Sequence, residues 1–358
     1  SDNLDQIEIR FLDKTGSGPS ETFDISDDWN ILSGTFNVTE NYTNDDMFKF
    51  AVVGTGEGQF VISKAELYPA DHINGCDPEI IRLLKESELP ILRWPGGNFV
   101  SGYHWRDGVG PVEKRPTRDN VAWSNIEPNL FGTDEFMQYC KDADIEPMIC
   151  INAGDGTPEE AADWVEYCNG AADTPMGKLR AENGHPDPYD VNVWEVGNEL
   201  YGKWQKGYAT SMGYPDRYVR FAKAMKEKDS SIILLANGAP LFFGGDEPWS
   251  DKKGADWNRR LIAKAGSSMQ WITDHILMGG AVPASTEPLD YYRDFMTYPE
   301  LFRPDYQMVE QLMKDAGIEE PRMAITELQQ FGGVKKAEEG EEAKLTRDNL
   351  SMPDRMGE

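Results

Sequence analysis

Hydrophobic and polar residues alternate in short runs along the first part of the chain. The runs at residues 7–11, 47–53 and 59–63 have the two-residue period of half-buried strands. Clusters of Gly, Asp, Asn and Ser separate them, as in an antiparallel β-sandwich. Because three strands are too few for a complete sandwich, we predict that residues 1–75 form only a part of one.

From Asp77 the pattern changes to helices that alternate with short apolar strands. Asp77 is a suitable N-cap, and Pro78 suits the first position of a helix. The predicted strands are short and apolar and cover residues 90–93, 147–152, 191–196, 232–236, 271–275 and 323–327. Helices are predicted at residues 78–84, 134–141, 157–167, 217–228, 256–265 and 305–316. The helix at 157–167 begins with a capping box, Thr157 to Glu160, and residues 170–190 read as a polar loop.

Strands that alternate with helices indicate a parallel sheet joined by right-handed crossovers. We therefore predict a (β/α)8 TIM barrel over residues 76–333, of which strands two to seven are present. Residues 334–358 are charged and read as a tail or a barrel loop. Since six strands would leave two exposed edges, we expect the native polypeptide to be longer at both ends.

Composition narrows the classes of function. The formal charge of −28 argues against nucleic acid, whose phosphates attract Lys and Arg, and against an anionic membrane surface. No apolar run reaches the ~18 residues of a membrane span. The four cysteines form no C-x-x-C pair and the four histidines show no metal-ligand spacing, so we predict neither a metal nor another cofactor.

Two strand ends carry candidate acid–base chemistry. The strand at 191–196 runs into Gly197, Asn198 and Glu199, and the last predicted strand ends at Glu327. In a parallel barrel such residues face a shared mouth, and glycoside hydrolysis requires two carboxylates there. The alternative is that both are ordinary surface glutamates in a chain with 63 acidic residues.

Several motifs then resemble one family. The stretch from Leu92 to Tyr103, with Arg-Trp-Pro-Gly-Gly-Asn at its centre, resembles the second-strand signature of family 51 α-L-arabinofuranosidases. Further similar stretches follow in the same order, at residues 105–111, 131–136, 156–161, 164–170 and 194–199. The resemblance is dense over residues 76–205 and thin over 206–333.

The resemblance implies roles for residues at both strand ends. Glu199 would be the general acid/base, and Asn198 would hydrogen-bond the 2-hydroxyl of the sugar. Glu327 would be the nucleophile of a retaining double displacement. Arg93 and Asn98 would line the pocket, where the charge of Arg93 would stabilise ionised Glu327.

The resemblance also implies roles for two ring side chains. Trp123 would stack on the leaving-group side, and His275 would orient the nucleophile or bind sugar. Each has a structural alternative, a core tryptophan and a buried barrel histidine. Residues 1–75 would be the end of the carbohydrate-binding-like sandwich that multidomain relatives insert after the first strand.

The chain departs from the family pattern at several positions. Leu277 stands where members usually carry a tyrosine, and Leu200-Tyr201-Gly202 replaces a more typical Met-Asp-Gly. The residues after Glu327 lack the common tryptophan-rich sequence, and the sugar-binding glutamate of the first strand is not in this chain.

The resemblance implies a retaining, exo-acting α-L-arabinofuranosidase that removes side chains from arabinoxylan or arabinan. Its partner would be an arabinose-containing polysaccharide or oligosaccharide, and we expect a secreted or cell-surface protein. The sequence leaves the oligomeric state open, with a homo-oligomer as one option. Two alternatives stay open: a related barrel hydrolase acting on β-glucan or xylan, and a non-catalytic carbohydrate-binding protein.

Overall fold

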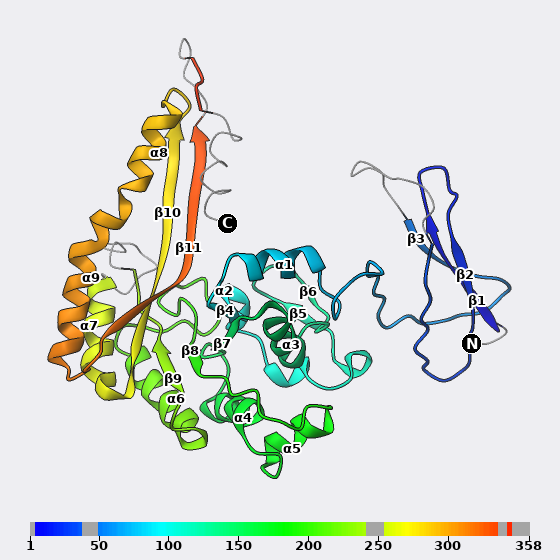
Figure 1. Ribbon diagram of the computed structural model, residues 1–358, viewed down its shortest axis with the longest axis horizontal. Helices are drawn as coiled ribbons and strands as arrows, with labels where there is room; N and C mark the ends of the chain where they lie inside the picture. The colour runs from blue at the N-terminus through cyan, green and yellow to red at the C-terminus, as the bar shows by residue number, and fades with distance from the viewer. Residues whose placement is uncertain (1–3, 38–48, 241–253, 336–341, 346–358) are drawn as a thin grey trace. The chain divides into compact units, whose positions relative to one another are not determined.

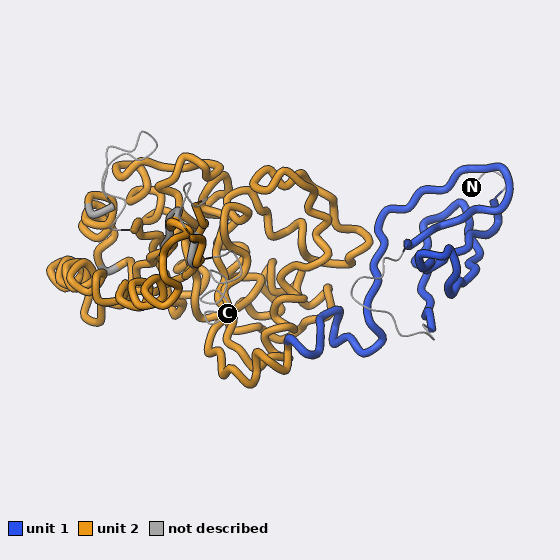
Figure 2. Tube along the Cα trace, turned by 90° about the horizontal axis from the view of Figure 1, so that it is seen from above, with its two compact units in different colours: residues 1–80 blue, residues 81–358 orange. Residues whose placement is uncertain are grey.

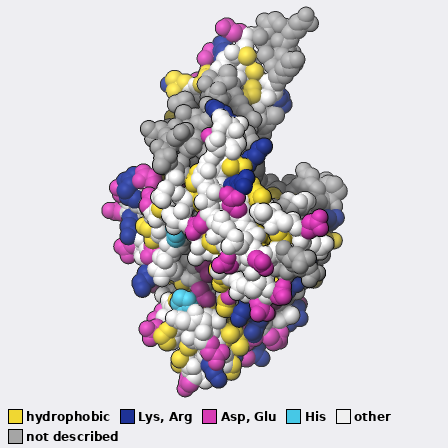
Figure 3. All heavy atoms as spheres, turned by 90° about the vertical axis from the view of Figure 1, so that its right-hand side faces the viewer, with side chains coloured by type: hydrophobic (Ala, Val, Ile, Leu, Met, Phe, Trp, Pro, Cys, Tyr) yellow, Lys and Arg dark blue, Asp and Glu magenta, His cyan; other side chains and the backbone are white. Residues whose placement is uncertain are grey.

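The chain forms two compact units. The computed structural model describes residues 4–37, 49–240, 254–335 and 342–345. Figure 2 distinguishes the two units, residues 1–80 and residues 81–358. Acidic side chains are scattered over the face drawn in Figure 3, which agrees with the strongly negative formal charge.

The first unit contains a three-stranded antiparallel sheet. In it β1 (Gln6–Leu12) lies between β2 (Ser20–Asp24) and β3 (Lys49–Gly54) (Figure 1). The strand predicted at 7–11 is therefore confirmed. Of the strand predicted at 47–53, the first two residues lie outside the described part of the chain and the rest form β3.

The strand predicted at 59–63 is wrong. These residues have no regular structure, and Phe60, Val61 and Ile62 are all exposed. Alternation gives a strand only when a neighbouring strand supplies hydrogen bonds, and in the described chain none pairs with this run. The sequence pattern also missed β2, whose polar sequence Ser-Glu-Thr-Phe-Asp hides its pairing with β1.

The second unit contains a parallel sheet of six strands in the order β11-β10-β9-β8-β7-β4. The strands are β4 (Ile91–Trp94), β7 (Glu146–Ile151), β8 (Val193–Val196), β9 (Ile233–Ala236), β10 (Trp271–Pro283) and β11 (Arg322–Lys335). Although β4 and β11 are the two edges of this sheet, the Arg93 Nη1 atom on β4 lies 3.2 Å from Glu327 Oε1 on β11. The sheet therefore curls until its edges face each other, which confirms the predicted barrel.

Helices cover the outer face of the sheet (Figure 1). They are α1 (Pro78–Glu86), α3 (Thr133–Ala143), α4 (Pro158–Asn169), α6 (Tyr214–Lys228), α7 (Gly254–Ala265) and α9 (Tyr298–Asp315). The main core lies between sheet and helices and includes Trp164, Trp194 and Tyr214. A smaller cluster around Met148, Val193 and Leu235 fills the inner face. Burying a side chain of this size stabilises the fold by about 1.5–3 kcal/mol.

Some connections are more regular than the sequence indicated. The predicted loop 170–190 contains α5 (Pro175–Glu182), which begins after Thr174, whose hydroxyl accepts a hydrogen bond from the Gly177 N–H. A hairpin of β5 (Arg118–Asn120) and β6 (Asn125–Glu127) was not predicted.

The region near the C-terminus also differs from the prediction. An additional helix, α8 (Pro288–Met296), precedes α9, and both lie beside the long β10–β11 pair in Figure 1. Strand β11 continues to Lys335, past the start of the predicted charged tail. Among the described helices, none has the length and apolar composition needed to cross a lipid bilayer.

Candidate active site

Side chains from four strands of the parallel sheet meet near the carboxyl ends of the short strands β4 and β8. Those from the longer strands β10 and β11 come from the interior of each strand. We call Arg93, Glu195, Glu199, His275, Thr326 and Glu327 the mouth cluster. In a barrel these strand ends surround one mouth, which is why residues far apart in sequence come together. Arg93 and Glu327, which are 234 positions apart, are hydrogen-bonded.

Arg93 is the centre of the mouth cluster. Its Nε donates to Glu195 Oε2 at 2.5 Å, its Nη2 to Asn198 Oδ1 at 2.5 Å, and its Nη1 to Glu327 Oε1 at 3.2 Å. Burial alone would lower the pKa of Arg93, but the surrounding acids, Glu195 first and Glu327 after it, together outweigh burial and raise the pKa. The guanidinium is therefore a fixed positive charge that orients three acceptors.

Glu199 lies in a loop held in a specific backbone conformation. Its φ of 46° is in the left-handed region, which is uncommon for a residue with a side chain. Gly197 before it has φ 87°, and a Cβ there would lie 2.5 Å from Leu200 Cδ1. The Leu200 N–H donates to Asn237 Oδ1 at 2.8 Å, which anchors the far side of the turn.

The carboxylate of Glu199 has three hydrogen-bond partners. Tyr201 Oη and His275 Nδ1 lie 3.0 Å from its Oε1, and Trp204 Nε1 lies 3.0 Å from its Oε2. Burial alone would raise the pKa of Glu199, but the contact with His275 and then the other donors lower it below its ordinary value. In this state Glu199 is held ionised, as a general base requires.

His275 lies between the two predicted catalytic carboxylates. Its Nδ1 is 3.0 Å from Glu199 Oε1 and 3.6 Å from Glu327 Oε2. Burial alone would lower the pKa of His275, but the hydrogen bond with Glu199 and then the charge of Glu327 raise it. The ring is almost fully buried and contacts Glu199 more closely than Glu327.

Glu327 is the most accessible acid of the mouth cluster. Its side chain is 28% exposed, compared with 9% for Glu199 and none for Glu195. An attacking carboxylate must reach the substrate, so this exposure agrees with the predicted role. Glu199 and Glu327 each offer a carboxylate oxygen within 4.8 Å of the other.

Asn198 has one unused donor. Its Oδ1 accepts from Arg93, but its Nδ2 is buried and has no hydrogen-bond partner among the described residues. A buried N–H without a partner costs about 1–3 kcal/mol, so a ligand acceptor at this point would recover that energy. Asn98, which follows β4, accepts a hydrogen bond at its Oδ1 from Gln205 Nε2 at 2.5 Å.

Trp123 lies at the protein surface. It sits in the turn between β5 and β6, and 59% of it is exposed. The core alternative for Trp123 is therefore wrong. Its predicted role, stacking on the leaving-group side of a substrate, stays a prediction.

The same geometry bears on metal binding. Glu199, His275 and Glu327 bring three ligand-type atoms within 4.8 Å of one another. Each of the two carboxylates is also bound by protein donors, Glu199 by Tyr201 and Trp204 and Glu327 by Arg93. These donors favour an acid–base site over a cation site, because they occupy lone pairs that a metal would need.

Comparisons with known proteins identify the family of this chain. The profile of the alpha-L-arabinofuranosidase 1 domain matches residues 83–264, half of the chain. The chain belongs to this family. The resemblance to family 51 α-L-arabinofuranosidases is therefore confirmed.

Individual relatives agree with this assignment. Probable alpha-L-arabinofuranosidase C of Aspergillus niger is 48% identical over 46% of this chain and 33% of its own length. The intracellular exo-alpha-(1->5)-L-arabinofuranosidase of Acetivibrio thermocellus is 43% identical over 46% of this chain and 33% of its own length. The alpha-L-arabinofuranosidase of Thermotoga maritima, solved with arabinose, has a TM-score of 0.64 and 36% identity over 76% of this chain and 52% of its own. The matched part is thus about a third of each curated relative and half of the solved chain.

Sequence reasoning missed several residues of this arabinofuranosidase-family site. Glu195 was overlooked although it is the one charged residue in an otherwise apolar strand, which is itself a signal for a buried partner. Tyr201 was noted only as a departure from the family pattern, and Trp204 was not noted. Both donate a hydrogen bond to Glu199. Thr326 had no signal, since its orientation depends on an irregularity in β11.

That irregularity is a β-bulge. His275 on β10 pairs with Glu327, while its neighbour Asp274 pairs with Ile325, so Thr326 is an extra residue. In a regular strand Thr326 and Glu327 would point to opposite faces. Here Thr326 Oγ1 lies 3.0 Å from His275 Nε2, and Glu327 faces Arg93, so both residues point into the mouth.

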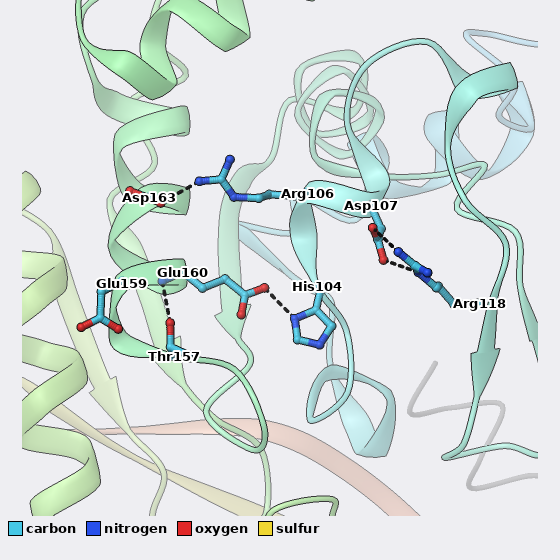
Figure 4. Close-up of a pocket in the computed structure, with 8 residues that line it drawn as sticks. All are labelled: His104, Arg106, Asp107, Arg118, Thr157, Glu159, Glu160 and Asp163. Atoms are coloured by element: carbon cyan, nitrogen blue, oxygen red, sulfur yellow. Dashed lines mark hydrogen bonds and ion pairs between the residues drawn. The ribbon is translucent and has the colours of Figure 1, made fainter.

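A second cluster of charged side chains lines a pocket of about 500 Å³ (Figure 4). We call it the charged pocket, and its lining residues are His104, Arg106, Asp107, Arg118, Thr157, Glu159, Glu160 and Asp163. Thr157 accepts from the Glu160 N–H as the predicted capping box requires. The Glu160 carboxylate turns to His104 Nδ1 at 2.8 Å, so the returning half of the predicted box is not formed.

Proposed function

We propose that this chain carries the catalytic centre of a retaining α-L-arabinofuranosidase that acts from the ends of its substrates. The observation that carries the proposal is that one carboxylate oxygen of Glu199, which follows β8, lies within 4.8 Å of one of Glu327, which lies in β11. Retaining glycosidases hold their two carboxyl groups about 5–5.5 Å apart, whereas inverting enzymes need about 6.5–9.5 Å to admit a water. The short separation therefore supports retention.

In the first step, Glu199 would protonate the glycosidic oxygen while Glu327 attacks the anomeric carbon. The carbon–oxygen bond to the leaving group breaks, and the leaving group departs with the proton. A covalent glycosyl–Glu327 ester remains. Arg93 Nη1, at 3.2 Å, would hold the Glu327 carboxylate aligned before the attack.

In the second step, the ionised Glu199 would remove a proton from water. The water oxygen attacks the anomeric carbon, and Glu327 leaves as a carboxylate. The three donors on Glu199 favour this ionised form. The unpartnered Asn198 Nδ2 is a suitable donor for a sugar hydroxyl next to the reacting carbon.

The names of relatives support the substrate class. The Acetivibrio thermocellus relative is named as an exo-acting enzyme on α-(1->5) linkages, and the Thermotoga maritima structure contains arabinose. We extend this to arabinofuranosyl side chains of arabinoxylan or arabinan as the substrate of this chain's native polypeptide.

The test is hydrolysis of a panel of aryl glycosides by the full native polypeptide and two variants. We expect cleavage of the α-L-arabinofuranoside and a loss of activity of about 10⁴-fold or more in Glu327→Ala, because the covalent nucleophile is removed. Azide should restore turnover and yield a glycosyl azide of inverted configuration. Glu320→Ala, which removes an 82% exposed acid just before β11, is the matched control.

Other outcomes would replace the proposal. Cleavage of β-glucosides or β-xylosides alone would mean a related barrel hydrolase with a different substrate. A folded protein that cleaves nothing but binds oligosaccharide would mean a carbohydrate-binding protein.

A further inference from the structure

Glu195 is a buried acid that the proposed mechanism does not use. Its side chain has no exposed surface and lies beneath the mouth. Glu195 Oε2 accepts from Arg93 Nε at 2.5 Å, and Oε1 accepts from Thr326 Oγ1 at 3.2 Å. A buried carboxylate with two donors is expensive to retain unless it orients something.

The hydrogen-bond directions along this chain of residues follow from what each group can do. Both oxygens of Glu195 are acceptors, since Arg93 Nε donates to Oε2 and Thr326 Oγ1 donates to Oε1. The single hydroxyl proton of Thr326 is therefore used on Glu195. Thr326 Oγ1 can then only accept from its other neighbour, His275 Nε2, at 3.0 Å. His275 must carry a proton on Nε2.

The consequence appears at the opposite side of the imidazole ring. With Nε2 protonated, the 3.0 Å contact between His275 Nδ1 and Glu199 Oε1 contains one proton. Either Glu199 is neutral and donates to Nδ1, or Glu199 is ionised and accepts from an imidazolium. Both arrangements hold the same number of protons and differ only in which atom carries the shared one.

We propose that Glu195 is a positioning residue that acts through Thr326 to keep His275 protonated at Nε2, so that His275 Nδ1 and Glu199 share one proton. This inference rests on the proposed role of Glu199 as acid/base and extends it. An ionised carboxylate with three donors is a poor acid, but a proton stored on the imidazole next to it can return to it. Glu195 thereby supplies the acid form that the first step needs.

Other charged groups near the imidazole ring also act on the His275–Glu199 pair. They are Glu199 and Glu195 from the β8 segment, Glu327 from β11, Arg93 from β4 and the neighbouring Asp274 on β10. Burial raises the pKa of Asp274 to about 6, and its Oδ1 accepts from the backbone N–H of His275. Asp274 hydrogen-bonds the backbone of His275 and not its ring. The hydrogen bond between Thr326 and Nε2 therefore decides which ring nitrogen carries the proton.

The direct test is nitrogen NMR of the full chain labelled with ¹⁵N-histidine. The chain has four histidines, and a His275→Asn variant identifies the signals of His275. We expect Nε2 of His275 to stay protonated from pH 5 to pH 9. In Thr326→Val, the neutral ring should change to the form protonated at Nδ1, which then donates to Glu199. Thr326→Ser, which keeps the hydroxyl, should retain the wild-type form.

Glu195→Gln tests whether Glu195 fixes the direction of the Thr326 hydroxyl. Its amide oxygen should face Arg93, leaving the amide NH₂ to donate to Thr326, whose hydroxyl then turns toward His275 Nε2. We expect the same change of ring nitrogen, and the pair should lose its shared proton at a pH lower by roughly one unit. His104, which contacts Glu160 outside the mouth cluster, is the internal control and should not change.

The outcomes separate this inference from the proposed function. A neutral wild-type ring protonated at Nδ1, or a Thr326→Val ring unchanged from wild type, would overturn the inference even if arabinofuranosides are cleaved. If Glu195→Gln does not fold, the Thr326→Val and Thr326→Ser pair still decides. These signals require no substrate, so a failed activity assay leaves the result interpretable.

Discussion

The mouth cluster and the charged pocket contain the same kinds of side chain but arrange them in different ways. In the charged pocket each cation has its own acid, as Figure 4 shows for Arg106 with Asp163 and Arg118 with Asp107. In the mouth cluster one guanidinium and one imidazole face three carboxylates. The charged pocket is built of separate pairs with Glu159 as an additional acid, whereas in the mouth cluster three carboxylates share the same two cations.

Exposure adds to this difference. The side chains of Arg106 and Arg118 are 44% and 59% exposed, so water and salt screen their ion pairs. Arg93 is 14% exposed and Glu195 is fully buried. An excess of acids in a screened pocket would simply ionise. In a buried site an excess of acids makes neighbouring groups share protons. Such shared protons are what acid–base catalysis requires.

The largest expected effect is on activity. Glu199→Gln should lower kcat/KM on natural oligosaccharides by about 10²–10⁴-fold, because proton donation to the leaving group is lost. On an aryl glycoside with an acidic phenol the loss should be smaller, since that leaving group needs no proton. Steady-state kinetics on both substrates measures the difference. Glu160→Gln in the charged pocket is the control, and a comparable loss there would remove the distinction between the two regions.

The next effect concerns stability. Arg93→Met should lower the free energy of unfolding by about 3–5 kcal/mol, because it leaves buried Glu195 without its cation. Arg118→Met should cost no more than about 1 kcal/mol, as exposed pairs do. Urea denaturation of both variants gives the two values. Equal losses would mean that burial does not separate the two regions.

The smallest effect is a pH dependence. The pKa of His275 is raised in the folded state, so its contribution is complete below its unfolded pKa and is lost as pH rises through the folded value. The pKa of Glu199 is lowered, so its contribution is present above its unfolded pKa and is lost on acidification. The pair therefore stabilises most between about pH 4.5 and 6.5.

His275→Phe removes this contribution. The variant should lose roughly 1–2 kcal/mol more stability at pH 5.5 than at pH 8.5. Denaturation curves at both pH values measure this, with His104→Phe as the exposed counterpart. A loss that does not change with pH would show that His275 contributes by packing alone.

The sequence was most informative where periodicity and strand ends coincide. Alternating strands and helices predicted the barrel, and Asn198 and Glu199 were found because they follow an apolar strand. Glu327 was found at the end of a predicted strand, although β11 continues past it to Lys335. The pairing of Arg93 with Glu195 could not be derived, because it depends on which strands are neighbours and how far the sheet curls. Runs such as 59–63 failed for a related reason, since a strand needs a partner that its own residues do not specify.

The bulge in β11 has a consequence for anyone who wishes to move this site into another protein. Copying the identities of Thr326 and Glu327 onto a regular strand would place one of them outside the barrel. A deletion of one residue at this point would have the same result without altering any catalytic side chain. The portable unit is therefore the backbone irregularity together with its two residues, and a transplanted site should be designed from the strand outward.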